Sequence, residues 1–176
     1  MARAVRSKSG LAPISAGQRV TRTLGPILAL PGEANAYHDA HIKRVAASFA
    51  RVTGAPLFES GLLGQGAWFG DFALLTHRGD DQATLNYGNA FALELWQCSW
   101  EEFTAMPSAA TAPPEDHGAR DILMRTVARD NFVRGYSGRR ISRKGRLFRI
   151  EDVTIWRLLD DDGGSFGVGA FFKDSR

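Results

Sequence analysis

The clearest spacing of apolar side chains in the first half of the chain lies between residues 37 and 52. Apolar residues recur there three, four and three positions apart, at Ile42, Val45, Phe49 and Val52. This spacing places them on one stripe of a helix. The sequence Gly-Ala-Pro at 54–56 is typical of a helix end. The pattern therefore predicts an amphipathic helix over residues 37–52.

The middle of the chain alternates turn-forming and apolar segments. The glycine-rich stretch 61–70 predicts a loop, and the run FALLTH at 72–77 predicts a strand that pairs with TLNYG at 84–88. Asn89 is a favourable residue type for a helix N-cap, and Ser99 begins a capping-box sequence. We therefore expect a hairpin followed by two short helices.

The C-terminal part begins with a helix and continues as strands. Residues 119–133 have a helical pattern, with a predicted buried stripe of Ile122, Leu123, Thr126 and Val127. Three strand segments follow, at 136–142, 146–159 and 165–172. Strands and helices do not alternate as a parallel sheet requires, so the pattern predicts an α+β fold with a C-terminal antiparallel meander.

The order of these elements resembles the PAS fold. Two segments are more specific: NYGNAFALELWQCSWEEF at 86–103 and YSGRRISRKGRLFRIEDVTIWRLLDDDG at 136–163. Both are similar to characteristic segments of the MEKHLA domain, a PAS-related family. The resemblance covers roughly residues 37–172. Unlike the plant members that give the family its name, this chain ends in GVGAFFKDSR, so no role of that terminal string is transferred.

The resemblance implies a PAS-like antiparallel sheet of about five strands, with helices on one face and an N-terminal flanking helix. It also implies a sensory or regulatory module, over residues 36–176, that has a small-molecule cavity and self-associates, and it implies no known reaction. We expect a small-molecule or regulatory protein partner and a homodimer formed through the helix 37–52. No output domain follows in the chain, so we expect signalling in trans; the cofactor is unknown.

Composition and charge limit the setting. The chain has 176 residues, 44% of them apolar, which suffices for one core, and no apolar run is long enough to span a membrane. Residues 1–35 lack periodicity and predict a disordered or mobile tail. Five basic and no acidic residues in the first 32 leave a transit peptide as an alternative. The single cysteine, Cys98, favours a reducing compartment, and we expect the cytoplasm.

The sequence contains no recognisable catalytic or metal-binding motif. It has no nucleophile elbow and no phosphate-binding loop, and its four histidines lack the spacing of a zinc site. Cys98 stands in the apolar setting LWQCSW, without the Asn-Cys-Arg motif of flavin-binding PAS photoreceptors. His117 precedes the helix on which haem-binding PAS domains carry their histidine. We therefore expect no enzyme and no metal, although acid–base chemistry in a cavity of this fold remains a further alternative.

A candidate ligand site follows from alternation along the strand 146–159. Alternation places Phe148, Ile150, Asp152, Thr154, Trp156 and Leu158 on one face, with a carboxylate in an apolar setting. A buried carboxylate needs hydrogen-bond donors. The functional hypothesis is a cavity whose ligand contacts are Tyr87, Asn89, Trp96, Tyr136, Asp152, Thr154 and Trp156. The alternatives are a bulge that turns Asp152 outward, or an internal partner such as Tyr87, Asn89 or Tyr136.

The segment 134–149 carries seven basic and no acidic residues and gives a second functional hypothesis. Tyr136 and Phe148 are interleaved with these charges, a combination that supports backbone contact and base stacking on nucleic acid. The residues that would bind nucleic acid are Arg139, Arg140, Arg143, Lys144 and Arg146. The alternative is a solvated hairpin whose charges discourage aggregation. We rank nucleic-acid binding below ligand sensing.

Overall fold

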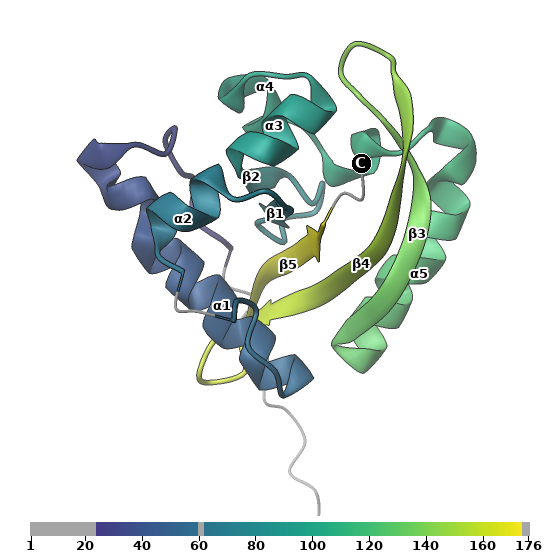
Figure 1. Cartoon of the computed structure of the whole chain (residues 1–176). Coiled ribbons are helices and arrows are strands. Elements are labelled where there is room, and N and C mark those ends of the chain that lie inside the picture. The colour runs from purple at the N-terminus through teal and green to yellow at the C-terminus, as the bar shows by residue number, and fades with distance from the viewer. Residues whose placement is uncertain (1–23, 60–61, 174–176) are drawn as a thin grey trace, which may run out of the picture.

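A computed structural model of the chain describes residues 24–59 and 62–173. Five strands form one antiparallel sheet in the order β2-β1-β5-β4-β3, with helices around it (Figure 1). The strands are β1 (Ala73–His77), β2 (Leu85–Gly88), β3 (Phe132–Ile141), β4 (Leu147–Leu159) and β5 (Ser165–Phe172). The α-helices are α1 (Asp39–Thr53), α2 (Gly64–Phe69), α3 (Ala90–Trp96), α4 (Trp100–Thr104) and α5 (His117–Asp130). The 3-10 helices are η1 (Glu33–His38), η2 (Ser108–Thr111) and η3 (Pro114–Asp116). The predicted α+β architecture with a five-stranded antiparallel sheet is confirmed.

Helix α1 covers one face of the sheet, as its apolar stripe predicts. Ile42, Val45 and Phe49 are buried there, and the Phe49 ring meets Trp156 of β4 edge-on, with 4.9 Å between the ring centroids. Gly54 ends the helix at a φ of 72°, a left-handed conformation that glycine adopts at no steric cost. The stripe therefore packs on its own domain, so a dimer could use only the outer side of α1.

Helices α3 and α5 cover the opposite face of the sheet. Leu95 and Trp96 of α3 form one buried cluster with Leu123 and Val127 of α5. Ile122 does not belong to this stripe, because it is 60% exposed. The predicted buried stripe of α5 is therefore wrong at this position.

The glycine-rich stretch 61–70 is not entirely a loop, because residues 64–69 form α2. The N–H of Gly64 donates to Asp39 Oδ1 at 3.0 Å, and a Cβ on Gly64 would stand 2.7 Å from the carbonyl oxygens of Ala36 and Tyr37. The glycine thus permits a close approach of α2 to η1. The loop prediction is wrong for α2.

Residues 24–35, which the sequence pattern leaves out of the fold, lie against the domain. The N–H of Gly25 donates to the carbonyl oxygen of Arg78 at 2.9 Å, and Asn86 Nδ2 donates to that of Pro26 at 2.8 Å. Residues 1–23, the remainder of the predicted tail, lie outside the described residues. No helix in the described ranges is long and apolar enough to cross a bilayer.

Strand β4 contains a bulge at its centre. Tyr136 of β3 is opposite Val153, while Gly138 is opposite Ile150, so β4 has one residue more than β3 between these two pairs. The extra residue brings Ile150 and Val153 to the same side of the sheet. Asp152 adopts a φ of 51° in the bulge and is exposed. The single alternating face predicted for β4 is therefore interrupted here.

Candidate functional site

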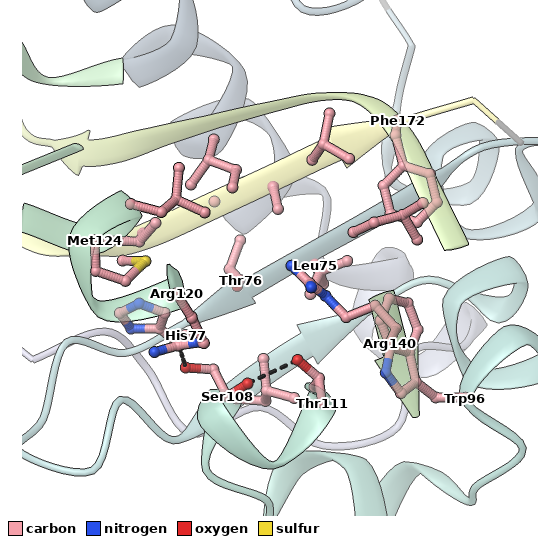
Figure 2. Close-up of a pocket in the computed structure, with 18 residues that line it drawn as sticks. Leu75, Thr76, His77, Trp96, Ser108, Thr111, Arg120, Met124, Arg140 and Phe172 are labelled. Atoms are coloured by element: carbon pink, nitrogen blue, oxygen red, sulfur yellow. Dashed lines mark hydrogen bonds between the residues drawn. The ribbon is translucent and has the colours of Figure 1, made fainter. Parts of the chain in front are cut away.

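A cavity of about 60 Å³ lies between the sheet and the elements η2, α3 and α5 (Figure 2). Strands β1, β4 and β5 supply apolar walls, among them Leu75, Ile150, Ile155 and Val168. Its polar lining residues are Thr76, His77, Ser108, Thr111, Arg120 and Arg140. No aspartate or glutamate of the described ranges lines it. The cavity is therefore mainly apolar, with an excess of positive charge.

Two arginines reach the cavity from different elements. Arg140 extends from β3 and is only 7% exposed, and Arg120 extends from the first half of α5. Figure 2 shows Arg140 reaching inward toward Leu75, while Arg120 lies beside Ser108. Arg120 Nη2 donates to Ser108 Oγ at 2.7 Å. Both arginines thus line the same cavity.

Arg140 is held by its own strand. Its Nη1 donates to the carbonyl oxygen of Arg139 at 2.7 Å and to Tyr136 Oη at 3.3 Å, and its Cζ lies 5.3 Å from the centre of the Tyr136 ring. A Cβ on Gly138 would stand 2.2 Å from Tyr136 Oη. The absent side chain at Gly138 therefore lets the Tyr136 ring lie along β3 and reach Arg140.

The neighbouring Arg139 shows the usual environment of an arginine. Its guanidinium makes two hydrogen bonds of 2.9 Å to the carboxylate of Asp116, which lower the pKa of that carboxyl group. Arg120 and Arg140 form no ion pair with any described residue. Burial lowers the pKa of Arg120, and the nearby charge of Arg140 lowers it further, while the charge of Asp121 acts in the opposite direction. The cavity therefore has two cations that form no direct ion pair with a described residue.

The structure brings two of the seven predicted ligand residues to this region. Trp96 lines the cavity, and Tyr136 contacts Arg140. Asp152 is exposed in the β4 bulge, and Thr154 is half-buried on the same side of the strand as Trp156. The prediction that Asp152 shares a buried face with Ile150 is wrong, because the bulge reverses the alternation between them. The bulge alternative describes the structure.

Three further predicted ligand residues lie away from the cavity. Tyr87 and Trp156 are fully buried in the cluster beneath α1, where burial raises the pKa of the Tyr87 hydroxyl. Asn89 caps α3, and its side chain makes four hydrogen bonds to backbone groups, at distances from 2.7 to 3.2 Å. Its amide has no remaining capacity for a ligand. The predicted capping role of Asn89 is confirmed.

The basic hairpin is less open than its sequence suggests. Arg140 points inward, Arg139 pairs with Asp116, and Arg146 Nη2 donates to the Leu95 carbonyl oxygen at 2.9 Å. Arg143 lies 3.6 Å from a carboxylate oxygen of Glu102, and Lys144 lies exposed in the turn. The predicted nucleic-acid residues therefore do not form one free cationic surface.

Cys98 and the metal-ligating residue types were the candidates for reactive chemistry in the described ranges. Burial raises the pKa of the half-buried Cys98 thiol to about 11, which disfavours the reactive thiolate. No group of three or more His, Cys, Asp or Glu side chains within the described ranges could hold a metal ion.

Neither Arg120 nor the inward direction of Arg140 was predicted from the sequence. Arg120 lies three residues before Leu123 and seven before Val127, so it extends the buried stripe of α5. Arg140 shares its side of β3 with Gly138 and Tyr136, at a spacing of two. The spacing along α5 and β3 could therefore have indicated that both arginines point inward. Basic side chains are usually exposed, however, so such a position is ordinarily predicted to face solvent.

The MEKHLA domain profile matches residues 39–176. The chain belongs to the MEKHLA domain family. This assignment covers every strand of the sheet and confirms the resemblance recognised from residues 86–103 and 136–163. No curated protein matches the sequence significantly.

Solved structures place this MEKHLA domain among PAS folds. A PAS domain from Colwellia psychrerythraea aligns with a TM-score of 0.55 at 16% identity, covering 63% of this chain and 92% of the other. A variant of the fungal photoreceptor VVD gives 0.53 at 14% identity, covering 76% and 93%. A PAS domain in complex with ethanol, from a LuxR-family transcriptional regulator of Burkholderia thailandensis, gives 0.50 at 15% identity, covering 64% and 96%. At these identities the likeness concerns the fold.

Proposed function

We propose that this MEKHLA domain is a non-catalytic sensory or regulatory module that binds a small molecule between the sheet and α5. The observation that carries the proposal is the partly open cavity with the buried side chain of Arg140 at its wall. Apolar cavities with a few polar groups that fix orientation are typical of small-molecule sites. The ethanol complex of the Burkholderia PAS domain provides a precedent in this fold for binding a small molecule.

Mass spectrometry of the full chain purified from its own host tests this proposal. Under native conditions the protein should carry a bound small molecule in stoichiometric amount. Denaturation should release this molecule so that it can be identified. A mass equal to that of the chain alone, in protein prepared without dialysis, would contradict the proposal.

A cavity-filling variant links the bound molecule to this site. Ala170 of β5 lines the cavity, so Ala170→Leu should occupy part of its volume and expel the ligand. Ala119 on α5 is exposed, so Ala119→Leu is the matched control and should keep the ligand. Melting temperatures near that of the wild type would show that both variants fold. Retention of the ligand by Ala170→Leu would place its site elsewhere.

The proposal also includes a response through a protein partner or a second copy, in the cytoplasm. The outer side of α1 presents small residues to solvent, Ala47 and Ala50, which would allow a second helix to approach closely. The cytoplasmic location rests on the single cysteine, and the organellar alternative depends on a segment that includes residues 1–23, outside the described ranges.

Nucleic-acid binding through the β3–β4 hairpin is the weaker candidate. Arg139 and Arg143 face carboxylates, and Arg140 faces the cavity. Any affinity should therefore be weak and independent of sequence, and it should fall steeply with salt because counterion release would drive it. Tight binding with base preference at about 0.15 M salt would favour this alternative over ligand sensing.

A further inference from the structure

We infer that the ligand of this cavity is a small organic carboxylate, bound by the guanidinium groups of Arg120 and Arg140. This inference rests on the proposed function and names the chemical class of the ligand. The charges of Asp116 and Asp121 act on Arg140 and Arg120, respectively, but no carboxylate is paired directly with either guanidinium group. Arg140 is 7% exposed, and neither it nor Arg120 forms an ion pair with a described residue. An unpaired buried charge is strongly destabilising, whereas an anion in the cavity would compensate it.

Arg139, the neighbour of Arg140 in the sequence, forms the ion pairs that the arginines at the cavity lack. Arg139 lies one position away, on the other side of β3, and pairs with both Asp116 and Glu115. The cavity lining, by contrast, contains no carboxylate from the described residues. Acidic side chains therefore pair with the arginine on the outer side of β3, whereas the cavity on the inner side keeps a net positive charge.

The unused donors have a suitable geometry for a carboxylate. All hydrogen bonds of Arg140 to described residues come from Nη1, which leaves Nη2 and Nε available at the cavity. A planar guanidinium presents parallel donors that match two carboxylate oxygens. Tyr136 fixes the orientation of Arg140, and Ser108 fixes that of Arg120. The donors are therefore positioned before a ligand arrives.

The remaining walls favour an organic anion over an inorganic one. Leu75, Leu85, Ile150 and Val168 line the cavity. A fully hydrated inorganic anion would gain nothing from these side chains, whereas a short alkyl group would bury apolar surface. The volume of about 60 Å³ restricts the ligand to a small molecule.

The inference is tested with matched pairs of probe molecules on the full chain. The protein is first unfolded in urea and refolded, so that any bound molecule is removed. Formate is compared with formamide and acetate with acetamide, and inorganic phosphate serves as a separate arm. Dissociation constants are obtained from the rise in melting temperature with probe concentration. Each carboxylate should bind roughly tenfold more tightly than its amide, or better, because only the carboxylate accepts charge-assisted hydrogen bonds from both arginines.

Three variants separate the cavity from general charge effects. Arg140→Met and Arg120→Met should remove the preference for the carboxylate, whereas Arg139→Met should keep it because Arg139 lies outside the cavity. Preferences are compared within each variant, so a changed basal stability does not affect the comparison.

The outcomes distinguish this inference from the proposed function. Equal binding of carboxylates and amides would overturn the inference and leave a ligand-binding module. Selective binding that survives in both Arg120→Met and Arg140→Met, or tighter binding of phosphate than of either carboxylate, would also overturn it. Absence of binding by every probe would overturn it as well, and the mass spectrum of the protein from its host would then decide the proposed function separately.

Discussion

Arg140 of β3 and Arg120 of α5 line the same cavity, where burial and, to a smaller extent, the charge of Arg140 lower the pKa of Arg120. Two like charges in an apolar space oppose folding when no anion is bound. We therefore expect the free energy of unfolding of the domain to be lower without a bound anion than with one. This relationship links the stability of the protein to occupancy of the cavity.

Arg140→Met should raise the free energy of unfolding of the ligand-free protein by about 1–3 kcal/mol, because it replaces a buried cation that has no direct ion pair with an unbranched apolar side chain. Urea denaturation measures this change. Arg139→Met is the control and should change stability by less than about 1 kcal/mol, since its ion pair is partly solvated. A large loss of stability in Arg140→Met would mean that Arg140 is primarily a structural residue.

Gly138→Ala should weaken carboxylate binding without altering any cavity-lining residue. A Cβ at this position would stand 2.2 Å from Tyr136 Oη, so the ring must move away from Arg140. We expect a loss of roughly tenfold in acetate affinity, the scale of one charge-assisted contact. Gly118→Ala on α5 is the matched control, because a Cβ there meets no atom within 4 Å. Unchanged affinity in Gly138→Ala would show that Tyr136 does not position Arg140.

Asn89→Ala should destabilise the domain far more than a second N-cap substitution. Asn89 is fully buried and bonds backbone groups of β1, of α2 and of the loop before β1. Its removal leaves several buried groups without partners, at a cost of about 1–3 kcal/mol each. Ser99→Ala removes an exposed cap and should cost only about 1 kcal/mol. Similar losses of stability in the two variants would contradict this account of Asn89.

The fold could be predicted from the sequence because its signals are local. The stripe of Ile42, Val45 and Phe49 needs only helical spacing, and the caps at Asn89 and Ser99 need only the residues of the next turn. The hairpin of β1 and β2 likewise joins neighbouring segments. Local patterns therefore specified most elements, while α2 was missed because its glycines serve packing as well as turns.

The site could not be predicted in the same way because it forms between distant elements. One additional residue in β4 moved Asp152 from the predicted buried face to solvent, and alternation alone does not reveal such a bulge. Arg120, Ser108 and Arg140 meet only after α5, η2 and β3 have packed together. The sequence identified Trp96 and Tyr136 near the cavity, but it did not identify the charges that define its chemistry.

If the domain dimerises through α1, the contact should involve the outer side of the helix. Ala50 is exposed, whereas Phe49 is buried against Trp156, so Ala50→Arg should disrupt a dimer while preserving the fold. Sedimentation equilibrium at micromolar concentration measures the mass of both proteins, and circular dichroism checks the fold. A monomeric wild type, or a variant that remains dimeric, would exclude an α1 interface.

The stability of the domain should fall between neutral and mildly acidic pH because of His41. Thr76 donates its hydroxyl to Asn86 Oδ1 at 2.7 Å, so His41 Nε2, 3.4 Å from Thr76 Oγ1, acts as the donor in that contact. The buried Nδ1 then has no partner among the described residues, and burial, with smaller contributions from neighbouring positive charges, lowers the pKa of His41 to about 4. The unfolded chain takes up the proton near its ordinary pKa of about 6.5, so stability present at neutral pH is lost as the pH falls from about 6.5 to about 4. Urea denaturation at about pH 7 and about pH 5 should show a loss about 2 kcal/mol larger in the wild type than in His41→Gln, since other titrating groups are common to both. Equal losses in the two proteins would mean that His41 can be protonated within the folded domain.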